Sequence, residues 1–320
     1  MSRNFFIYIE KERIENASSA CVDKPAARLY NLCMVKVRAY AKLNFFLKVT
    51  GTDEKGYHLL DTVMASVSLF DEISVSRRAD GRINIVCPAI KGENTALPAA
   101  KLFQERFSTC GFDIRIEKGI PVAAGFGGSS ADIAGVLYAL GKMFRKDFES
   151  LTEIAARCGS DAPFMLKGGF ARATGRGEKV APFECGKTYH LVAAKPSGGV
   201  PSGEAYKLYD EMKRQGQIPE NMADGLQVAK ALKKGDLACL SALCVNDLAV
   251  PAKKLLPQIA EVERMLGQFS PACLFISGSG SGVAAVFETE EKASACAREL
   301  EKRGVFARAV TTMQRGVEEI

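Results

Sequence analysis

The pattern of apolar and polar residues predicts a chain rich in strands up to about residue 118. Short runs in which the two kinds alternate are typical of half-buried strands. The predicted strands are 34–41, 41–50, 63–70, 72–77, 82–87 and 112–117. Helical spacing of apolar residues predicts one helix at 94–107, and Gly51–Gly56 is a predicted turn.

Further along, helices and strands mix. A glycine- and serine-rich loop at 121–132 precedes a helix at 133–144. The remaining predictions are helices at 151–158, 204–214, 223–234, 236–244, one ending near 267 and 290–303, and strands at 189–195, 272–277, 283–287 and 305–311. Both halves therefore contain both element types, which predicts an α+β fold in two lobes, 34–186 and 187–320. Residues 1–33 show no periodicity and are interpreted as an N-terminal extension outside the core.

Composition narrows the class of protein. With 47% hydrophobic and 25% charged residues, the chain resembles an ordinary globular enzyme. The net charge of +6 is scattered, so we expect neither a nucleic-acid partner nor a membrane surface. No apolar run approaches the ~18 residues of a membrane span. The ten cysteines form no C-x-x-C pair and there are two histidines, which argues against zinc and favours a reducing, cytoplasmic setting.

The loop at 121–132 is the strongest candidate for chemistry. Glycines allow the backbone to approach phosphates closely, successive N–H groups can form an anion-binding nest, and the following helix adds its positive dipole end. Ser129 and Ser130 add hydroxyl groups. The loop lacks the Gly-Lys-Ser/Thr ending of a Walker A motif and the Rossmann spacing. A purely structural Gly-Ser loop is the alternative.

Two other segments place polar groups in unusual positions. Lys42 and Asn44 point to the same face of a predicted strand, where a buried charge is costly unless it is paired. Tyr57 and His58 follow a turn and could stack on a base or ring. The alternatives are a solvated strand edge and a packed turn, respectively.

A carboxylate and a second glycine-rich turn complete the candidates. Asp161, in Gly-Ser-Asp-Ala-Pro-Phe, could accept a hydroxyl proton during phosphoryl transfer, or it could simply cap a helix. Residues 277–282, Ser-Gly-Ser-Gly-Ser-Gly, could form a tight hairpin or a second wall facing phosphate.

Taken in order, these segments resemble the GHMP kinase superfamily. The resemblance spans about 35–287 and is closest to the branch whose substrate carries a cytidine diphosphate group. Gly56-Tyr-His58 is the most specific match, and Asn246-Asp-Leu248 agrees as well. The resemblance implies an N-lobe like ribosomal protein S5, a ferredoxin-like C-lobe, ATP and Mg²⁺ as cofactors, and a small-molecule substrate for a monomer or homodimer. It does not identify protein ligands of the metal.

The resemblance also implies roles for individual residues. Asp161 would be the general base, and Lys42 would stabilise the developing charge. Asn44 would orient the polyol end of the substrate, while Tyr57 and His58 would frame the cytosine. The expected ATP-binding residues are Pro121, Ala124, Gly125, Gly127, Gly128, Ser129, Ser130, Asn94 and Lys118.

The chain departs from the superfamily loop at two positions. Ser129 stands where a glycine is usual and Ala131 replaces a second serine, which predicts a slight shift of the loop and the loss of one phosphate contact. The alternatives to the leading interpretation are another GHMP kinase, of homoserine or mevalonate type, and a non-catalytic nucleotide-binding protein. Retention of both Lys42 and Asp161 argues against the non-catalytic protein.

Overall fold

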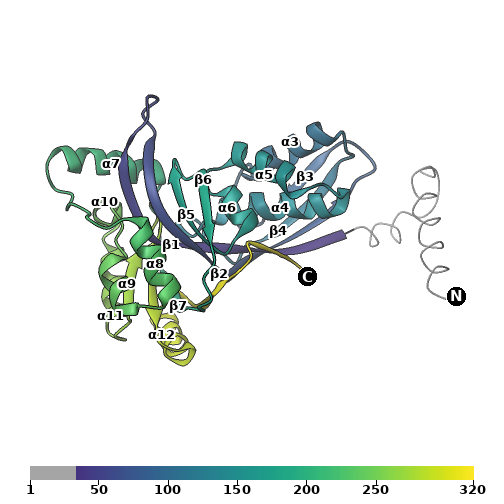
Figure 1. Cartoon of the computed structure of the whole chain (residues 1–320). Helices are drawn as coiled ribbons and strands as arrows, with labels where there is room; N and C mark the ends of the chain where they lie inside the picture. The colour runs from purple at the N-terminus through teal and green to yellow at the C-terminus, as the bar shows by residue number, and fades with distance from the viewer. Residues whose placement is uncertain (1–33) are drawn as a thin grey trace. The chain divides into compact units, whose positions relative to one another are not determined.

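A long β-hairpin organises the part of the chain that the computed structural model describes, residues 34–320 (Figure 1). The predicted extension, 1–33, lies outside the described residues. The hairpin consists of β1 (Met34–Thr52) and β2 (His58–Arg77), which are neighbours in the sheet. Each is one continuous strand, whereas the sequence predicted two shorter strands in each place.

Asp71 explains why the second strand looked interrupted. A carboxylate in mid-strand is typical of a turn, but this one is fully buried and remains in the ladder. Its Oδ1 accepts hydrogen bonds from the backbone N–H groups of Gly119 and Ile120, each at 2.8 Å. The buried carboxylate therefore joins β2 to the segment that leads into the glycine-rich loop.

Four further strands from the N-terminal half of the chain extend the sheet that the hairpin begins. They are β3 (Ile83–Val86), β4 (Phe112–Glu117), β5 (Phe170–Gly175) and β6 (Lys179–Phe183). β2 pairs antiparallel with both β4 and β5, β3 pairs parallel with β4, and β5 pairs with β6. The sequence did not predict β5 and β6, in which small and polar residues hide the alternation.

The helices α3 (Leu97–Phe107), α4 (Gly128–Phe144), α5 (Phe148–Cys158) and α6 (Ala162–Lys167) gather on one side of these strands (Figure 1). α4 lies deepest, and a Cβ at Gly135 would overlap the side chain of Ile73 in β2. This close approach fixes the middle of α4 relative to the sheet. The helix begins at Gly128 rather than at residue 133, so the end of the predicted loop is its first turn.

The C-terminal half contributes the other strands and helices. Its strands are β7 (His190–Lys195), β8 (Cys273–Ile276), β9 (Val283–Phe287), β10 (Phe306–Met313) and β11 (Val317–Glu319). Its helices are α7 (Ser202–Arg214), α8 (Gly225–Lys234), α9 (Leu237–Leu243), α10 (Ala249–Leu255), α11 (Gln258–Gly267) and α12 (Glu290–Lys302).

The two halves share one sheet, with the strand order β11-β1-β2-β10-β7-β9-β8 along its main path. The end of β10 pairs with β2, while most of β10 pairs with β7. A partly buried ion pair adds to this connection: Arg172 of β5 donates to the buried Asp61 of β2 at 2.7 and 3.0 Å, and Asp61 also accepts from the N–H of Gly225 at the start of α8.

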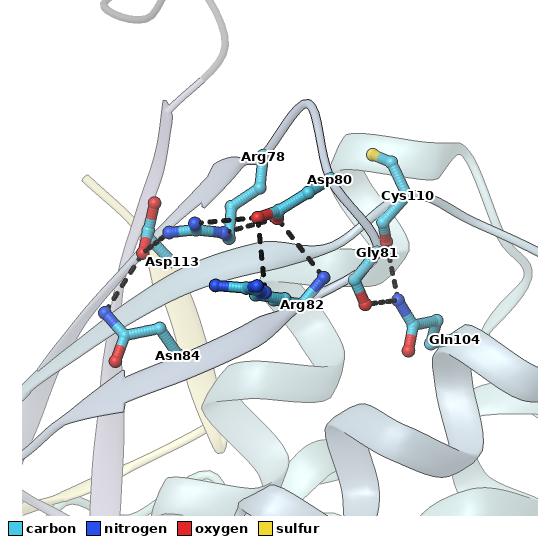
Figure 2. A network of polar contacts seen from close by, with 8 residues as sticks. All are labelled: Arg78, Asp80, Gly81, Arg82, Asn84, Gln104, Cys110 and Asp113. Carbon is cyan, nitrogen blue, oxygen red and sulfur yellow. Dashed lines mark hydrogen bonds and ion pairs between the residues drawn. The ribbon is translucent and has the colours of Figure 1, made fainter.

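A polar network closes the turn after β2 (Figure 2). Arg78 donates to Asp80 at 2.7 Å and to Asp113 of β4 at 2.8 Å, which sharply raises the pKa of Arg78 and lowers that of Asp80 to about 2. These groups are exposed, so the network orders the turn more than it stabilises the fold. Within residues 34–320, no helix has the length and apolar character needed to cross a bilayer.

Candidate active site

A cavity of about 260 Å³ lies between the glycine-rich loop and the turn that joins β8 to β9. Among the described residues, its lining includes both predicted catalytic side chains, Lys42 and Asp161. It also includes every residue predicted to bind the nucleotide: Asn94, Lys118, Pro121, Ala124, Gly125, Gly127, Gly128, Ser129 and Ser130. Segments distant in sequence therefore meet at one cavity.

The backbone of the loop has the alternation expected of an anion-binding nest. Ala123, Gly125 and Gly127 have φ values of 56°, 78° and 78°, in the left-handed region. At Gly125 a Cβ would overlap the carbonyl oxygen of Ser277 in the opposite turn, so this position requires glycine. Ser129 lies in the first turn of α4 and has no positive φ, so the usual glycine is not needed there.

Groups on other elements donate hydrogen bonds to the carbonyl oxygens of the loop. The oxygens of residues 123, 124 and 125 accept from Ser281 Oγ at 3.2 Å, Gly282 N at 2.8 Å and Ser277 Oγ at 3.2 Å. The oxygen of Phe126 accepts from the N–H of Lys42 at 3.0 Å. The glycine-serine turn is the tight hairpin between the antiparallel strands β8 and β9, as one of the two sequence interpretations held, and it also holds the loop in place.

Lys118 is held behind the loop by two buried carboxylates. Its Nζ donates to Asp71 Oδ2 at 2.5 Å and to Asp132 at 2.9 and 3.0 Å. One ammonium cannot neutralise two buried carboxylates, and Asp71 also receives two backbone N–H donors. Burial and the negative charge of Asp71 therefore raise the pKa of Asp132 to about 7, even though Lys118 opposes the shift.

Lys42 and Asp161 form a second ion pair that lines the cavity. Lys42 Nζ lies 3.4 Å from Asp161 Oδ2, and the lysine side chain is 5% exposed against 32% for the aspartate. The lysine also donates to Asn44 Oδ1. A buried ammonium is tolerated because it is paired, while its carboxylate partner remains open enough to meet a substrate.

Asp161 occupies the N-cap position of α6 without acting as a cap. Its side chain accepts no capping hydrogen bond. By contrast, Asp147 at the N-cap of α5 accepts from the N–H of Ser150 at 2.8 Å. The capping alternative therefore does not account for the carboxylate of Asp161.

The residues predicted to bind substrate lie outside this cavity. Asn44 is buried behind Lys42. Tyr57 is exposed, and the guanidinium of Arg176 lies 4.2 Å from the centre of its ring. His58 stacks on Tyr206 of α7 with ring centroids 4.6 Å apart, and its Nε2 lies 2.8 Å from Asp210 Oδ1.

Tyr206 was not among the residues predicted from the sequence. It lies on a helix far along the chain, yet the negative charge of Asp161 adds to burial in raising its pKa. Tyr206 therefore contacts His58 and lies within electrostatic range of Asp161. Ser202 and Ser279, joined by a 2.6 Å hydrogen bond between their hydroxyls, also line the cavity. Ser279 belongs to the candidate turn 277–282, whereas Ser202 was not among the predicted site residues.

The geometry defines a two-lobed kinase of GHMP type, and comparisons with known proteins agree. The family described as GHMP kinases N terminal domain matches residues 94–169, and GHMP kinases C terminal matches residues 228–305. A crystal structure of 4-(cytidine 5'-diphospho)-2C-methyl-D-erythritol kinase has a TM-score of 0.74 and 30% identity, covering 87% of this chain and 98% of that one. The mevalonate kinase of L. major, at 17% identity and a TM-score of 0.69, shares the fold.

Curated relatives narrow the family. The 4-diphosphocytidyl-2-C-methyl-D-erythritol kinase of Desulfitobacterium hafniense is 40% identical over 287 residues, covering 88% of this chain and 97% of the relative. The enzyme of that name from Cutibacterium acnes is 36% identical, covering 77% of this chain and 83% of the relative. The chain belongs to the family of 4-diphosphocytidyl-2-C-methyl-D-erythritol kinases. The expected fold class and the expected branch of the superfamily are both confirmed.

Proposed function

We propose that the chain transfers the γ-phosphoryl group of ATP to the 2-hydroxyl of 4-diphosphocytidyl-2-C-methyl-D-erythritol, a step in isoprenoid precursor synthesis. The observation that carries this function is one cavity that joins a phosphate-binding nest to a lysine–aspartate pair. Family membership identifies the substrate, because the relatives are named as kinases of this compound. We also propose a cytoplasmic enzyme, because the cysteines of the described part are free thiols.

The triphosphate would lie along the loop and the first turn of α4. Four successive carbonyl oxygens of the loop accept hydrogen bonds from other elements. The amide N–H groups of the loop would donate to the phosphate oxygens. Pro121, Ala124, Gly125, Gly127, Gly128 and Ser129 would supply this surface. Lys118 and Asn94 would lie toward the nucleoside end, with Lys118 held in place by its two carboxylates.

Mg²⁺ would occupy this site bound to the phosphates of ATP. Among residues 34–320 there is no cluster of three metal-ligating side chains, so the phosphate oxygens would be its main ligands. Ser130, whose side chain lines the cavity, would add a protein oxygen. The metal would neutralise charge on the phosphates during transfer.

The transfer would be direct. Asp161 Oδ2 takes the proton as the substrate hydroxyl oxygen bonds to Pγ, and the bond from Pγ to the bridging oxygen breaks to release ADP. Lys42, 3.4 Å from that carboxylate, stabilises the negative charge on the transferred group. Asn44 would help to orient the polyol end of the substrate.

The cytosine would lie near the hairpin tip, framed by Tyr57 and His58. Asp210 can only accept a hydrogen bond, so His58 Nε2 carries a hydrogen and, in the neutral ring, Nδ1 is left as an acceptor. An acceptor matches the exocyclic amino group of cytosine and opposes the carbonyl of uracil. Tyr206, stacked on His58, connects this base site to the reacting end.

A substrate panel tests the proposal. ADP release is followed with ATP, Mg²⁺ and, in turn, 4-diphosphocytidyl-2-C-methyl-D-erythritol, homoserine and mevalonate. Turnover restricted to the cytidylyl substrate is expected. Turnover with homoserine or mevalonate instead would retain the lysine–aspartate chemistry and refute the cytosine site. A folded protein that binds ATP and turns over none of the three would refute the proposed function.

A further inference from the structure

A chain of hydrogen bonds runs from the ammonium of Lys42 into the core of the sheet. Lys42 Nζ donates to Asn44 Oδ1, and Asn44 Nδ2 donates to Thr62 Oγ1 at 2.8 Å. Thr62 Oγ1 in turn donates to the carbonyl oxygen of Phe46 at 2.6 Å. The side chains of Lys42, Asn44 and Thr62 belong to residues that are 4%, 3% and 3% exposed, so water cannot replace a missing partner.

The number of protons along this chain fixes its direction. A hydroxyl has one hydrogen, and a carbonyl oxygen can only accept. Because Thr62 gives its hydrogen to Phe46, it can present only lone pairs to Asn44. The amide must therefore turn its NH₂ group toward Thr62, which leaves its oxygen facing Lys42.

The orientation of the amide matters because Lys42 has only donors. An ammonium facing an amide oxygen gains a charge-assisted hydrogen bond, whereas an ammonium facing an amide NH₂ meets another donor. Ser277 Oγ also lies 3.4 Å from Asn44 Oδ1, but its single hydrogen is given to the carbonyl oxygen of Gly125 at the shorter distance of 3.2 Å, while its oxygen accepts from the backbone N–H of Asn44. Thr62 therefore sets the orientation of the amide.

We propose that Thr62 is a positioning residue for phosphoryl transfer: through Asn44, it holds the ammonium of Lys42 at the place where that ammonium meets Asp161 and the transferred phosphate. This inference rests on the proposed function. It adds Thr62, a residue of β2 outside the cavity lining, to the group that supports catalysis.

Substitutions that change only the hydroxyl separate this role from packing. Thr62→Val has almost the same shape and removes both hydrogen bonds, whereas Thr62→Ser keeps both. Losing the hydrogen bond that orients a charged donor corresponds to a fall in kcat on the order of 10- to 100-fold. KM for ATP should remain nearly unchanged because the loop is untouched. Thr62→Ser should retain most of the activity.

Thr312→Val is the matched control. Thr312 is also buried in the sheet, and its hydroxyl accepts from the backbone N–H of Tyr189 at 3.0 Å, with no connection to Lys42. This variant should lose stability in urea without losing kcat. If both valine variants lose stability but kcat falls in neither, Thr62 is structural and the inference is wrong.

A double-mutant cycle tests whether Thr62 acts through Asn44. Rates of Asn44→Ala, Thr62→Val and the double variant are measured in single-turnover conditions, which resolve slow transfer. The expected result is that Thr62→Val has little further effect once Asn44 is gone. Equal effects in both backgrounds, or Thr62→Ser as slow as Thr62→Val, would overturn the inference. A wild-type protein that fails to turn over would instead refute the proposed function.

Discussion

Replacing Asp161 with asparagine removes the proposed base and keeps the shape of the side chain. The amide cannot take the proton of the substrate hydroxyl. A positioned general base contributes about 10²- to 10⁴-fold, so kcat should fall by that factor, equivalent to about 3–5 kcal/mol of activation free energy. The loss should appear with the cytidylyl substrate at saturating ATP.

ATP binding should survive the same substitution. The side chain of Asp161 is 32% exposed, so water can take part of its place beside Lys42, and Asn44 Oδ1 still accepts from the Lys42 ammonium in the variant. None of the hydrogen bonds that hold the loop in place involves Asp161. The Kd for ATP should therefore change by less than about tenfold, or about 1.4 kcal/mol.

Two measurements and one control decide this prediction. ADP release gives kcat, and a calorimetric titration gives the Kd for ATP. Asp147→Asn is the control, because Asp147 is a genuine N-cap and asparagine is an equally good cap. It should leave kcat and stability almost unchanged. If Asp161→Asn loses ATP binding together with turnover, or loses less than about tenfold in kcat, the assignment of Asp161 as base is refuted.

The remaining predictions concern pH, specificity and chain length. The pKa of Asp132 rises from 3.8 to about 7 on folding, so the folded chain retains a proton that the unfolded chain loses, and stability falls as pH rises across that window. Asp132→Asn should flatten this fall in urea unfolding between about pH 4 and about pH 7; an unchanged slope would contradict the assignment. Asp210→Asn lets either ring nitrogen of His58 carry the hydrogen, so steady-state kinetics should show a higher KM for the cytidylyl substrate at an unchanged KM for ATP. Equal discrimination against the uridylyl analogue would count against this role of Asp210. Deleting residues 1–33 should leave kcat unchanged, since every proposed site residue lies beyond Met34; a large loss of turnover or of solubility would show that the segment belongs to the fold.

The sequence predicted what depends on local pattern. The loop at 121–132 combines glycine spacing with a following helix, so its nature followed from neighbouring residues alone. The fold class followed likewise from the alternation of strands and helices. Strands β5 and β6 were missed because their small and polar residues carry too little hydrophobic contrast for a period of two to appear.

What the sequence could not predict depends on contacts between distant segments. Asp71 resembled a turn residue, and only the sheet shows that it supports Lys118 across the loop. Tyr206 meets His58 from a helix that no local signal connects to the hairpin. Thr62 is an ordinary strand residue by propensity, and its importance appears only when the protons of Asn44 are counted.

The fate of the γ-phosphate is the most direct test of the central claim. The protein is incubated with ATP labelled at the γ-phosphorus, Mg²⁺ and 4-diphosphocytidyl-2-C-methyl-D-erythritol, and the products are separated. The account predicts that the label appears in the cytidylyl product as a phosphate monoester on the 2-hydroxyl, in amounts equal to the ADP formed. Label that appears only as inorganic phosphate, or that stays in ATP, would contradict it.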